Sequence, residues 1–340
     1  MATPQPLPPQ PFQIDLWTNL CESKRITKAH SRHFLALSVL FLLPLAFSFS
    51  VYPYIYQLFS ESSAPTVETH LSFLFLPYNQ ETPIPLPTKP IIFSVIYALF
   101  LLIFTSLATG SITYSVFHGF YGRPVKLISA LKSALTSFPR LLSTYIVSEL
   151  IVSGLFLLLA LILIAMLKTI DFLGFQIHYS SPKFTSLLLF LLVIFLCFVI
   201  YLQVNWIFAP VIAVIESSWG LKSLKRSKYL VKGTRWVSLS MLLFYGFLSG
   251  ILGWLISARW DDSSADQWKN WLFVLHIVWT STCYLLILLS NFAATTVFYM
   301  YSKAIHGELA WEIAQEFATE YVSLPFDDGK VPHVVSVVYG

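Results

Sequence analysis

The chain has 340 residues, of which 56% are hydrophobic and only 11% are charged. Soluble globular domains carry about 25% charged residues, so this composition excludes an ordinary soluble domain and indicates a membrane protein. The formal net charge is only +4, and the three cysteines, Cys21, Cys197 and Cys283, have no disulfide, metal or redox spacing.

The first 33 residues precede the first apolar stretch. Residues 1–13 contain five prolines and predict an extended leader. Residues 14–33 mix apolar side chains with lysine and arginine, and predict a short amphipathic helix on the membrane surface. Cys21 lies in this helix, either as a free thiol or as a palmitoylation site.

Six later segments are long and apolar enough to cross a bilayer, which takes about 20 residues. They cover residues 34–59, 91–118, 141–167, 184–215, 236–258 and 271–302. The prediction is an all-α, polytopic membrane helix bundle of six transmembrane helices over residues 34–303, with a tail over residues 304–340. Pro44 and Pro53 predict kinks in the first span.

The distribution of basic residues predicts the orientation of these spans. If the N-terminus is cytosolic, 16 of the 21 lysines and arginines lie in cytosolic segments. We therefore expect both termini in the cytosol. The acidic residues Asp15 and Glu22 and the scarcity of arginine near the start are untypical of a transit peptide. The endoplasmic reticulum or another endomembrane is favoured over a plastid.

The fourth and fifth spans are joined by a strongly basic segment, residues 216–235, which we call the basic elbow. Its six basic residues are Lys222, Lys225, Arg226, Lys228, Lys232 and Arg235. We expect a short helix over residues 218–233, capped by Ser217 or Ser218 and ended by Gly233.

The other residues of the basic elbow suggest how this helix meets its surroundings. Leu221, Leu224 and Val231 are expected to face the bilayer, with the lysines around them. Glu216 is expected to pair with one of the bases or to accept the free N–H groups at the helix start. The elbow either only fixes topology at the membrane surface or binds anionic lipid headgroups or a phosphorylated ligand.

The pattern I-E-S-x-x-G-L-K-S-L-K-R-S-K-x-L-x-K-G in the elbow resembles a family of plant six-span membrane proteins of largely unassigned function. It is distantly similar to the bacterial membrane domain associated with glycerophosphodiester phosphodiesterases. Leu224 and Lys228 depart from the bacterial pattern, which favours the plant resemblance. The resemblance implies a fold and a membrane location, and it does not imply phosphodiesterase chemistry.

The loop after the second span, residues 123–140, is also short, basic and amphipathic. It predicts a second elbow helix at residues 123–137. Its likeness to the basic elbow suggests a duplicated unit in which spans two and three mirror spans four and five. Two such loops can also arise independently.

A few polar residues interrupt the apolar spans. They are Glu149, Gln203, Asn205 and Asn291. The three amides either tie helices together or line one polar cavity with Glu149. If Glu149 does not line such a cavity, it is a structural acid that is protonated or hydrogen-bonded. Gly246 and Gly250 form a GxxxG pattern that predicts close helix packing, within the bundle or across a homo-oligomer.

Acidic residues recur every fourth position in the tail. They are Glu308, Glu312, Glu316 and Glu320. This spacing predicts an amphipathic cytosolic helix whose acidic face is either solvated or docked on the basic elbow.

The sequence contains no nucleotide-binding, hydrolase or metalloprotease motif, and its eight histidines are scattered. We therefore predict no catalytic residue, no metal site and no cofactor, and nucleic acid is an unfavoured partner. The leading hypothesis is a non-enzymatic endomembrane scaffold or accessory factor that binds anionic lipid or partner proteins through its basic elbows. The alternative is a carrier for a small or lipid-like substrate, with a polar path near Glu149, Asn205 and Asn291.

Overall fold

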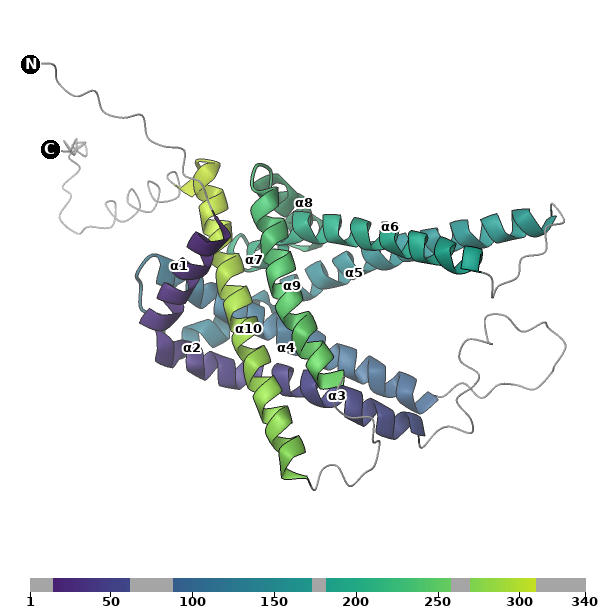
Figure 1. Cartoon of the computed structure of the whole chain (residues 1–340). Coiled ribbons are helices and arrows are strands. Elements are labelled where there is room, and N and C mark those ends of the chain that lie inside the picture. Colours follow the sequence, from purple (N-terminus) through teal and green to yellow (C-terminus); the bar gives the residue numbers. More distant parts are fainter. Residues whose placement is uncertain (1–14, 62–87, 173–181, 258–269, 310–340) are drawn as a thin grey trace, which may run out of the picture.

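A computed structural model describes residues 15–61, 88–172, 182–257 and 270–309, and every regular element within them is a helix (Figure 1). In chain order these elements are α1 (Leu16–Ala29), α2 (Ser31–Leu37), the π-helical turn η1 (Ser38–Leu42), α3 (Leu43–Glu61), α4 (Thr88–Phe120), α5 (Leu127–Phe172), α6 (Pro182–Trp206), α7 (Ala209–Ile215), α8 (Gly220–Leu230), α9 (Arg235–Ser257) and α10 (Trp271–Ile305).

Six stretches of helix in the described residues are long and apolar enough to span a membrane. They are Ser31–Gln57, Pro90–Phe120, Leu127–Thr169, Phe184–Ile215, Arg235–Ser257 and Trp271–Ile305. The predicted all-α class with six spans is therefore confirmed. The first span is irregular near a proline that was predicted to disturb it, because η1 ends at Leu42, two residues before Pro44.

The third span begins earlier than predicted, and it absorbs the predicted second elbow. α5 is a continuous helix of 46 residues, about 69 Å long, with Pro139 inside it. Residues 127–137 are therefore its first turns, and the prediction of a separate elbow helix at 123–137 is wrong. The basic elbow differs because Gly233, with φ of +100°, ends the turn after α8, whereas residues 127–140 contain no glycine.

The closest helix contact made by a glycine joins α4 to α5. A Cβ atom built on Gly110 would lie 2.9 Å from the Cα atom of Ala134. This distance is shorter than real Cβ contacts, so the two backbones can approach this closely only because residue 110 is a glycine. The contact fixes the N-terminal part of α5 against the bundle.

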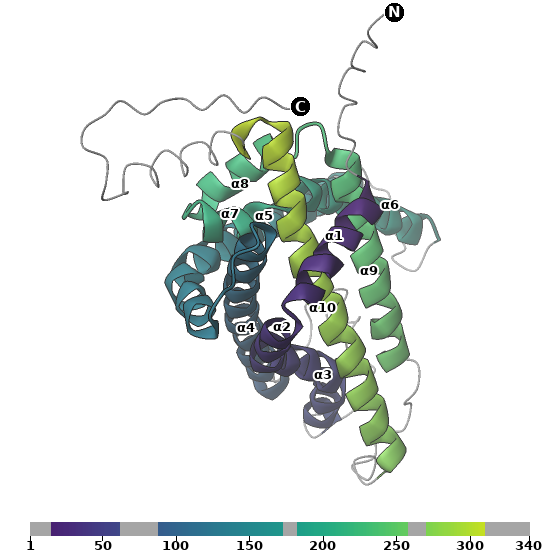
Figure 2. The same cartoon turned by 90° about the vertical axis from the view of Figure 1, so that its left-hand side faces the viewer.

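α1 packs against the bundle, although it was predicted to lie on the membrane surface. Figure 2 shows α1 running alongside α10, and Asn19, Ser23 and Ile26 are buried between them and their neighbours. The Asn19 side chain donates a hydrogen bond to the carbonyl oxygen of Ala294 at 3.1 Å. A buried amide needs such partners, so Asn19 fixes α1 to the middle of α10. The Pro-rich arm lies outside the described residues.

The elements next to both chain ends gather at one end of the molecule. α1, α8 and the C-terminal end of α10 lie together there, while α5 and α6 extend away from α9 and α10 (Figures 1 and 2). The basic elbow is therefore placed beside the start and the end of the six-span domain.

Candidate functional site

The basic elbow begins at a break in the fourth span. Pro210 has no N–H group, and the helix is interrupted between Trp206, where α6 ends, and Ala209, where α7 begins. Ser227 of α8 binds both sides of this break. Its hydroxyl accepts a hydrogen bond from the Phe208 N–H at 3.1 Å and donates one to the Asn205 carbonyl at 2.8 Å. Ser227 therefore holds α8 against the broken span.

We expect Ser227→Ala to destabilise the protein because it leaves two buried backbone groups without their partner. The cost should be about 1–3 kcal/mol, seen as a lower midpoint of thermal unfolding of the full-length protein in detergent. Ser223→Ala is the matched control. Ser223 is buried one turn earlier on α8, and its hydroxyl has no hydrogen-bond partner, so its loss should be neutral. Equal midpoints for the two variants would contradict this role of Ser227.

The start of α8 differs from the predicted capping. The helix begins at Gly220, and its N-cap residue Trp219 makes no side-chain capping hydrogen bond. Ser217 has a positive φ of 54°, and Ser218 is buried before the cap position. The serines therefore form the turn that leads into α8, and the prediction that they cap it is wrong.

The apolar residues of α8 face two directions. Leu221 is 54% exposed, but Leu224 is 3% exposed and Val231 is fully buried. Val231 belongs to the hydrophobic core formed by α6, α7, α9 and α10. Two of the three residues predicted to face the bilayer therefore anchor α8 to the protein interior, because the helix lies directly against the bundle.

Arg226 is the centre of an ionic cluster that joins α8 to its neighbours. Its Nε atom lies 3.1 Å from Oε2 of Glu216, and a terminal nitrogen of the same guanidinium forms an ion pair with Glu308. Tyr299 of α10 donates a hydrogen bond to the other Glu216 oxygen at 2.8 Å. Burial opposes the charge on Arg226, but the hydrogen bonds that its guanidinium donates to Glu308 and Glu216 outweigh this effect and raise the pKa of the guanidinium.

The cluster bears out two expectations from the sequence. Glu216 pairs with a base of the basic elbow, as predicted. Glu308, the first acid of the tail stripe, binds the elbow through Arg226. Glu312, Glu316 and Glu320 lie outside the described residues, so docking of the rest of the stripe stays a prediction.

The last turns of α10 add contacts that the sequence did not reveal. Ser302 donates a hydrogen bond to the carbonyl oxygen of Leu230, at the end of α8, at 2.5 Å. Lys303 is only 6% exposed, and its Nζ atom lies 5.6 Å from the centre of the Tyr299 ring. The only signal for these roles was the spacing of Tyr299, Ser302 and Lys303 on neighbouring turns of one helix face.

The remaining bases of the elbow form an exposed surface. Its members are Lys222, Lys225, Lys228, Lys232 and Arg235, and all five are exposed. Trp219, Leu221 and Tyr229 lie among them and are each more than half exposed. A surface that combines cations with apolar and aromatic side chains suits the boundary between headgroups and acyl chains. Arg226 differs from the other five because its guanidinium is already paired.

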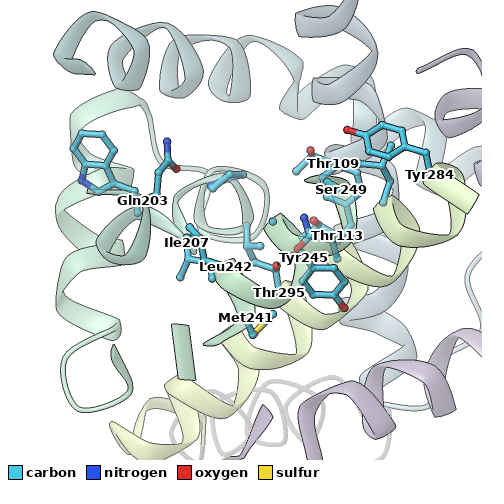
Figure 3. A pocket seen from close by; sticks show the side chains of 17 residues that line it. Thr109, Thr113, Gln203, Ile207, Met241, Leu242, Tyr245, Ser249, Tyr284 and Thr295 are labelled. Atoms are coloured by element: carbon cyan, nitrogen blue, oxygen red, sulfur yellow. Dashed lines mark hydrogen bonds between the residues drawn. The ribbon is translucent and has the colours of Figure 1, made fainter. Parts of the chain in front are cut away.

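A cavity of about 380 Å³ lies beside the elbow, between α4, α6, α7, α9 and α10 (Figure 3). It is lined by Thr109, Thr113, Gln203, Trp206, Ile207, Pro210, Val211, Met241, Leu242, Tyr245, Gly246, Ser249, Tyr284, Leu288, Asn291, Phe292 and Thr295. Gln203 lies on one side of it and Thr109 and Tyr284 on the other (Figure 3). Pro210 and Val211 connect the cavity wall to the elbow through α7.

Only two of the four predicted intramembrane polar residues meet in this cavity. Gln203 and Asn291 line it. Glu149 is exposed on α5, away from the cavity lining. Asn205 is buried, and its amide donates to the Tyr201 carbonyl at 2.6 Å. Of the three residues predicted near a polar path, only Asn291 lines this cavity, so the cavity does not join Glu149, Asn205 and Asn291.

The GxxxG pattern on α9 does not make a close helix contact within the chain. Gly246 and Gly250 are both exposed, and a Cβ atom on either would meet nothing within 4 Å. Gly246 lines the cavity, whereas Gly250 does not. Packing across a homo-oligomer stays a prediction for both glycines. Nowhere in the described ranges do three His, Cys, Asp or Glu side chains cluster so that they could hold a metal ion.

The six apolar helices, each long enough to cross a bilayer, define a polytopic α-helical membrane protein. The chain belongs to the family described as domain of unknown function DUF8558, whose model matches residues 13–322. No curated protein and no solved structure matches the chain. The resemblance to plant six-span proteins and to the bacterial membrane domain stays a prediction.

Proposed function

We propose that this protein is a non-enzymatic, multi-pass scaffold or accessory factor that binds anionic lipid headgroups through the exposed bases of the basic elbow. The observation that supports this proposal is that one of the six bases is paired with carboxylates of the protein and the other five are exposed. Arg226 is paired inside the protein, while the other five project from it next to exposed apolar side chains. Each base near an anionic surface contributes about 1 kcal/mol of attraction.

The proposal includes a location. We place the protein in the endoplasmic reticulum or another endomembrane, with both termini and the elbow in the cytosol. The excess of basic residues on that side supports this orientation, and anionic lipids are enriched in cytosolic leaflets. The resemblance of the elbow to plant six-span proteins supports an endomembrane role. Partner proteins would bind the same surface or the acidic tail.

The lipid interaction can be tested on the purified full-length protein. In Lys222→Gln, Lys225→Gln, Lys228→Gln and Lys232→Gln combined, the preference for phosphatidylserine over phosphatidylcholine should fall by at least about tenfold, equivalent to about 1.4 kcal/mol. Native mass spectrometry of the retained lipids measures this preference. The reason is the loss of four exposed cations from one surface.

The control for this experiment removes the same charge elsewhere at the same end of the bundle. It combines Lys24→Gln, Lys28→Gln, Lys126→Gln and Lys132→Gln, which change exposed or solvent-facing bases of α1 and of the region around the start of α5. This variant should keep most of the preference. If both variants lose it equally, the elbow is not the binding surface, and general charge attraction explains the effect.

A further inference from the structure

We propose that the cavity between α4, α6, α7, α9 and α10 binds the polar part of an uncharged lipid that bears hydroxyl or ester oxygens and no phosphate. This site is separate from the exposed basic surface, and the inference does not depend on the proposed function. A volume of about 380 Å³ lies at the lower end of the range of ligand pockets and is too small for a whole two-chain lipid. It suits a glycerol ester group or a sterol hydroxyl with its adjacent ring.

The chemistry of the lining selects against charge. The hydrogen-bonding side chains around the cavity are Thr109, Thr113, Gln203, Trp206, Tyr245, Ser249, Tyr284, Asn291 and Thr295. The seventeen lining residues, all of them in the described part of the chain, include no Asp, Glu, Lys, Arg or His. A phosphate placed among them would lose its hydration without gaining a counter-charge, which costs several kcal/mol, on the order of the penalty for any unpaired buried ion.

Several of these groups have hydrogen-bonding capacity to spare. Asn291 accepts a long hydrogen bond from Thr295 at 3.5 Å, and its amide nitrogen donates none to the described chain. The hydroxyls of Ser249 and Tyr284 line the same cavity, and each can donate one hydrogen bond and accept others. Polar groups at membrane depth are costly unless they are satisfied. A ligand with two or three oxygens would satisfy them.

The position of the cavity favours entry from the bilayer. Met241 and Ser249 lie six and fourteen residues after Arg235, the first residue of α9, which corresponds to about 9 and 21 Å along the helix. The cavity therefore lies within the hydrocarbon layer, which is about 30 Å thick. Its exposed lining residues are Gln203 of α6 and Gly246 of α9, so its mouth lies on surfaces that face lipid.

The apolar part of the lining complements the rest of such a molecule. Ile207, Leu242, Leu288 and Phe292 provide a hydrophobic wall next to the polar groups. A mixed wall of this kind fits an amphipathic molecule better than a cluster of water alone, because water gains nothing from the apolar side.

α9 supplies a matched pair of variants for the test. Gly246→Leu would fill the cavity at its mouth, and a Cβ atom there meets nothing within 4 Å, so the helix tolerates it. Gly250→Leu makes the same change one turn later, at another exposed glycine without neighbours and outside the cavity lining. Both changes replace a helical glycine by a better helix former.

The experiment uses the full-length protein in lipid nanodiscs that contain a trace of photoreactive lipid. The three probes are a diacylglycerol, a sterol and a phosphatidylserine, each with a diazirine in its apolar part, and labelled peptides are mapped by mass spectrometry. We expect the diacylglycerol or the sterol to label the segments 241–249 and 284–295, and which of the two does so identifies the lipid class. Gly246→Leu should reduce this labelling by about tenfold, equivalent to about 1.4 kcal/mol, and Gly250→Leu should not.

Asn291→Leu provides a second test that leaves the cavity mouth open. It should reduce labelling by roughly threefold to tenfold, since one hydrogen bond contributes about 0.5–1.5 kcal/mol. The proposal is overturned if the phosphatidylserine probe labels the same segments as strongly, or if Gly246→Leu and Gly250→Leu behave alike. It is also overturned if no probe labels the cavity, which would make it a water-filled space.

Discussion

Replacing Arg226 by glutamine is expected to lower the thermal stability of the protein substantially. The substitution leaves Glu216 and Glu308 facing each other without the guanidinium that both of them bind. Breaking a partly buried ionic cluster on one side costs about 3 kcal/mol, since the remaining charges lose their partner. For a chain of this size the midpoint of unfolding should fall by roughly 4 °C.

Two further variants test this explanation: a control at the adjacent residue Lys225, and a second substitution at Glu308 that should restore stability. Lys225→Gln removes an exposed charge from the adjacent position and should change the midpoint by less than about 1–2 °C. Adding Glu308→Gln to Arg226→Gln should restore part of the lost stability because it removes one of the two stranded carboxylates. Tryptophan fluorescence during heating in detergent measures all three. A midpoint for Arg226→Gln equal to that of Lys225→Gln would show that the cluster contributes nothing.

Enlarging Gly110 is expected to have a similarly large effect through a different cause. A Cβ atom at this position would lie 2.9 Å from the Cα atom of Ala134, so a side chain can be accommodated only if α5 moves away from α4. Gly110→Ala should cost about 1–2 kcal/mol and Gly110→Leu about 3 kcal/mol, since overpacking grows with side-chain size. Thermal unfolding and retention of a single elution peak on gel filtration measure the loss.

The control for Gly110 lies on the partner helix. Gly154 of α5 is exposed, and a Cβ atom there meets nothing within 4 Å. Gly154→Leu should be neutral or slightly stabilising, because leucine has the higher helix propensity. If Gly110→Leu is as stable as Gly154→Leu, the close approach of α4 and α5 is not required for folding.

The number and approximate limits of the six spans could be predicted because they follow from one local property. A backbone crossing a bilayer must satisfy its own hydrogen bonds, so length and hydropathy are enough to find it. The limits of α5 were missed because a proline within a glycine-free stretch did not stop the helix. Before α7, by contrast, the helix is broken near Pro210. There the Ser227 side chain supplies hydrogen bonds to the backbone groups that the break leaves without helical partners.

The contacts between helices could be predicted much less well. Arg226 and Lys225 are adjacent bases in the sequence, and only the position of Glu216 and Glu308 in space separates a paired residue from an exposed one. Glu308 was a sound candidate because the predicted topology places it on the same side as the elbow. The hydrogen bond of Asn19 could not be predicted, because nothing in the sequence around Asn19 indicates that the Ala294 carbonyl of α10 lies within reach.

The short helix α7 connects the cavity to the ionic cluster around Arg226. Pro210 and Val211 at its first turn form part of the cavity wall, and Glu216 directly after its last residue holds Arg226. Seven helical residues span only about 10 Å and do not bend, so displacement at one end is felt at the other. If a ligand in the cavity changes the free energy of the ionic cluster through α7, thermodynamic linkage requires a change in the cluster to alter the affinity for that ligand by the same factor.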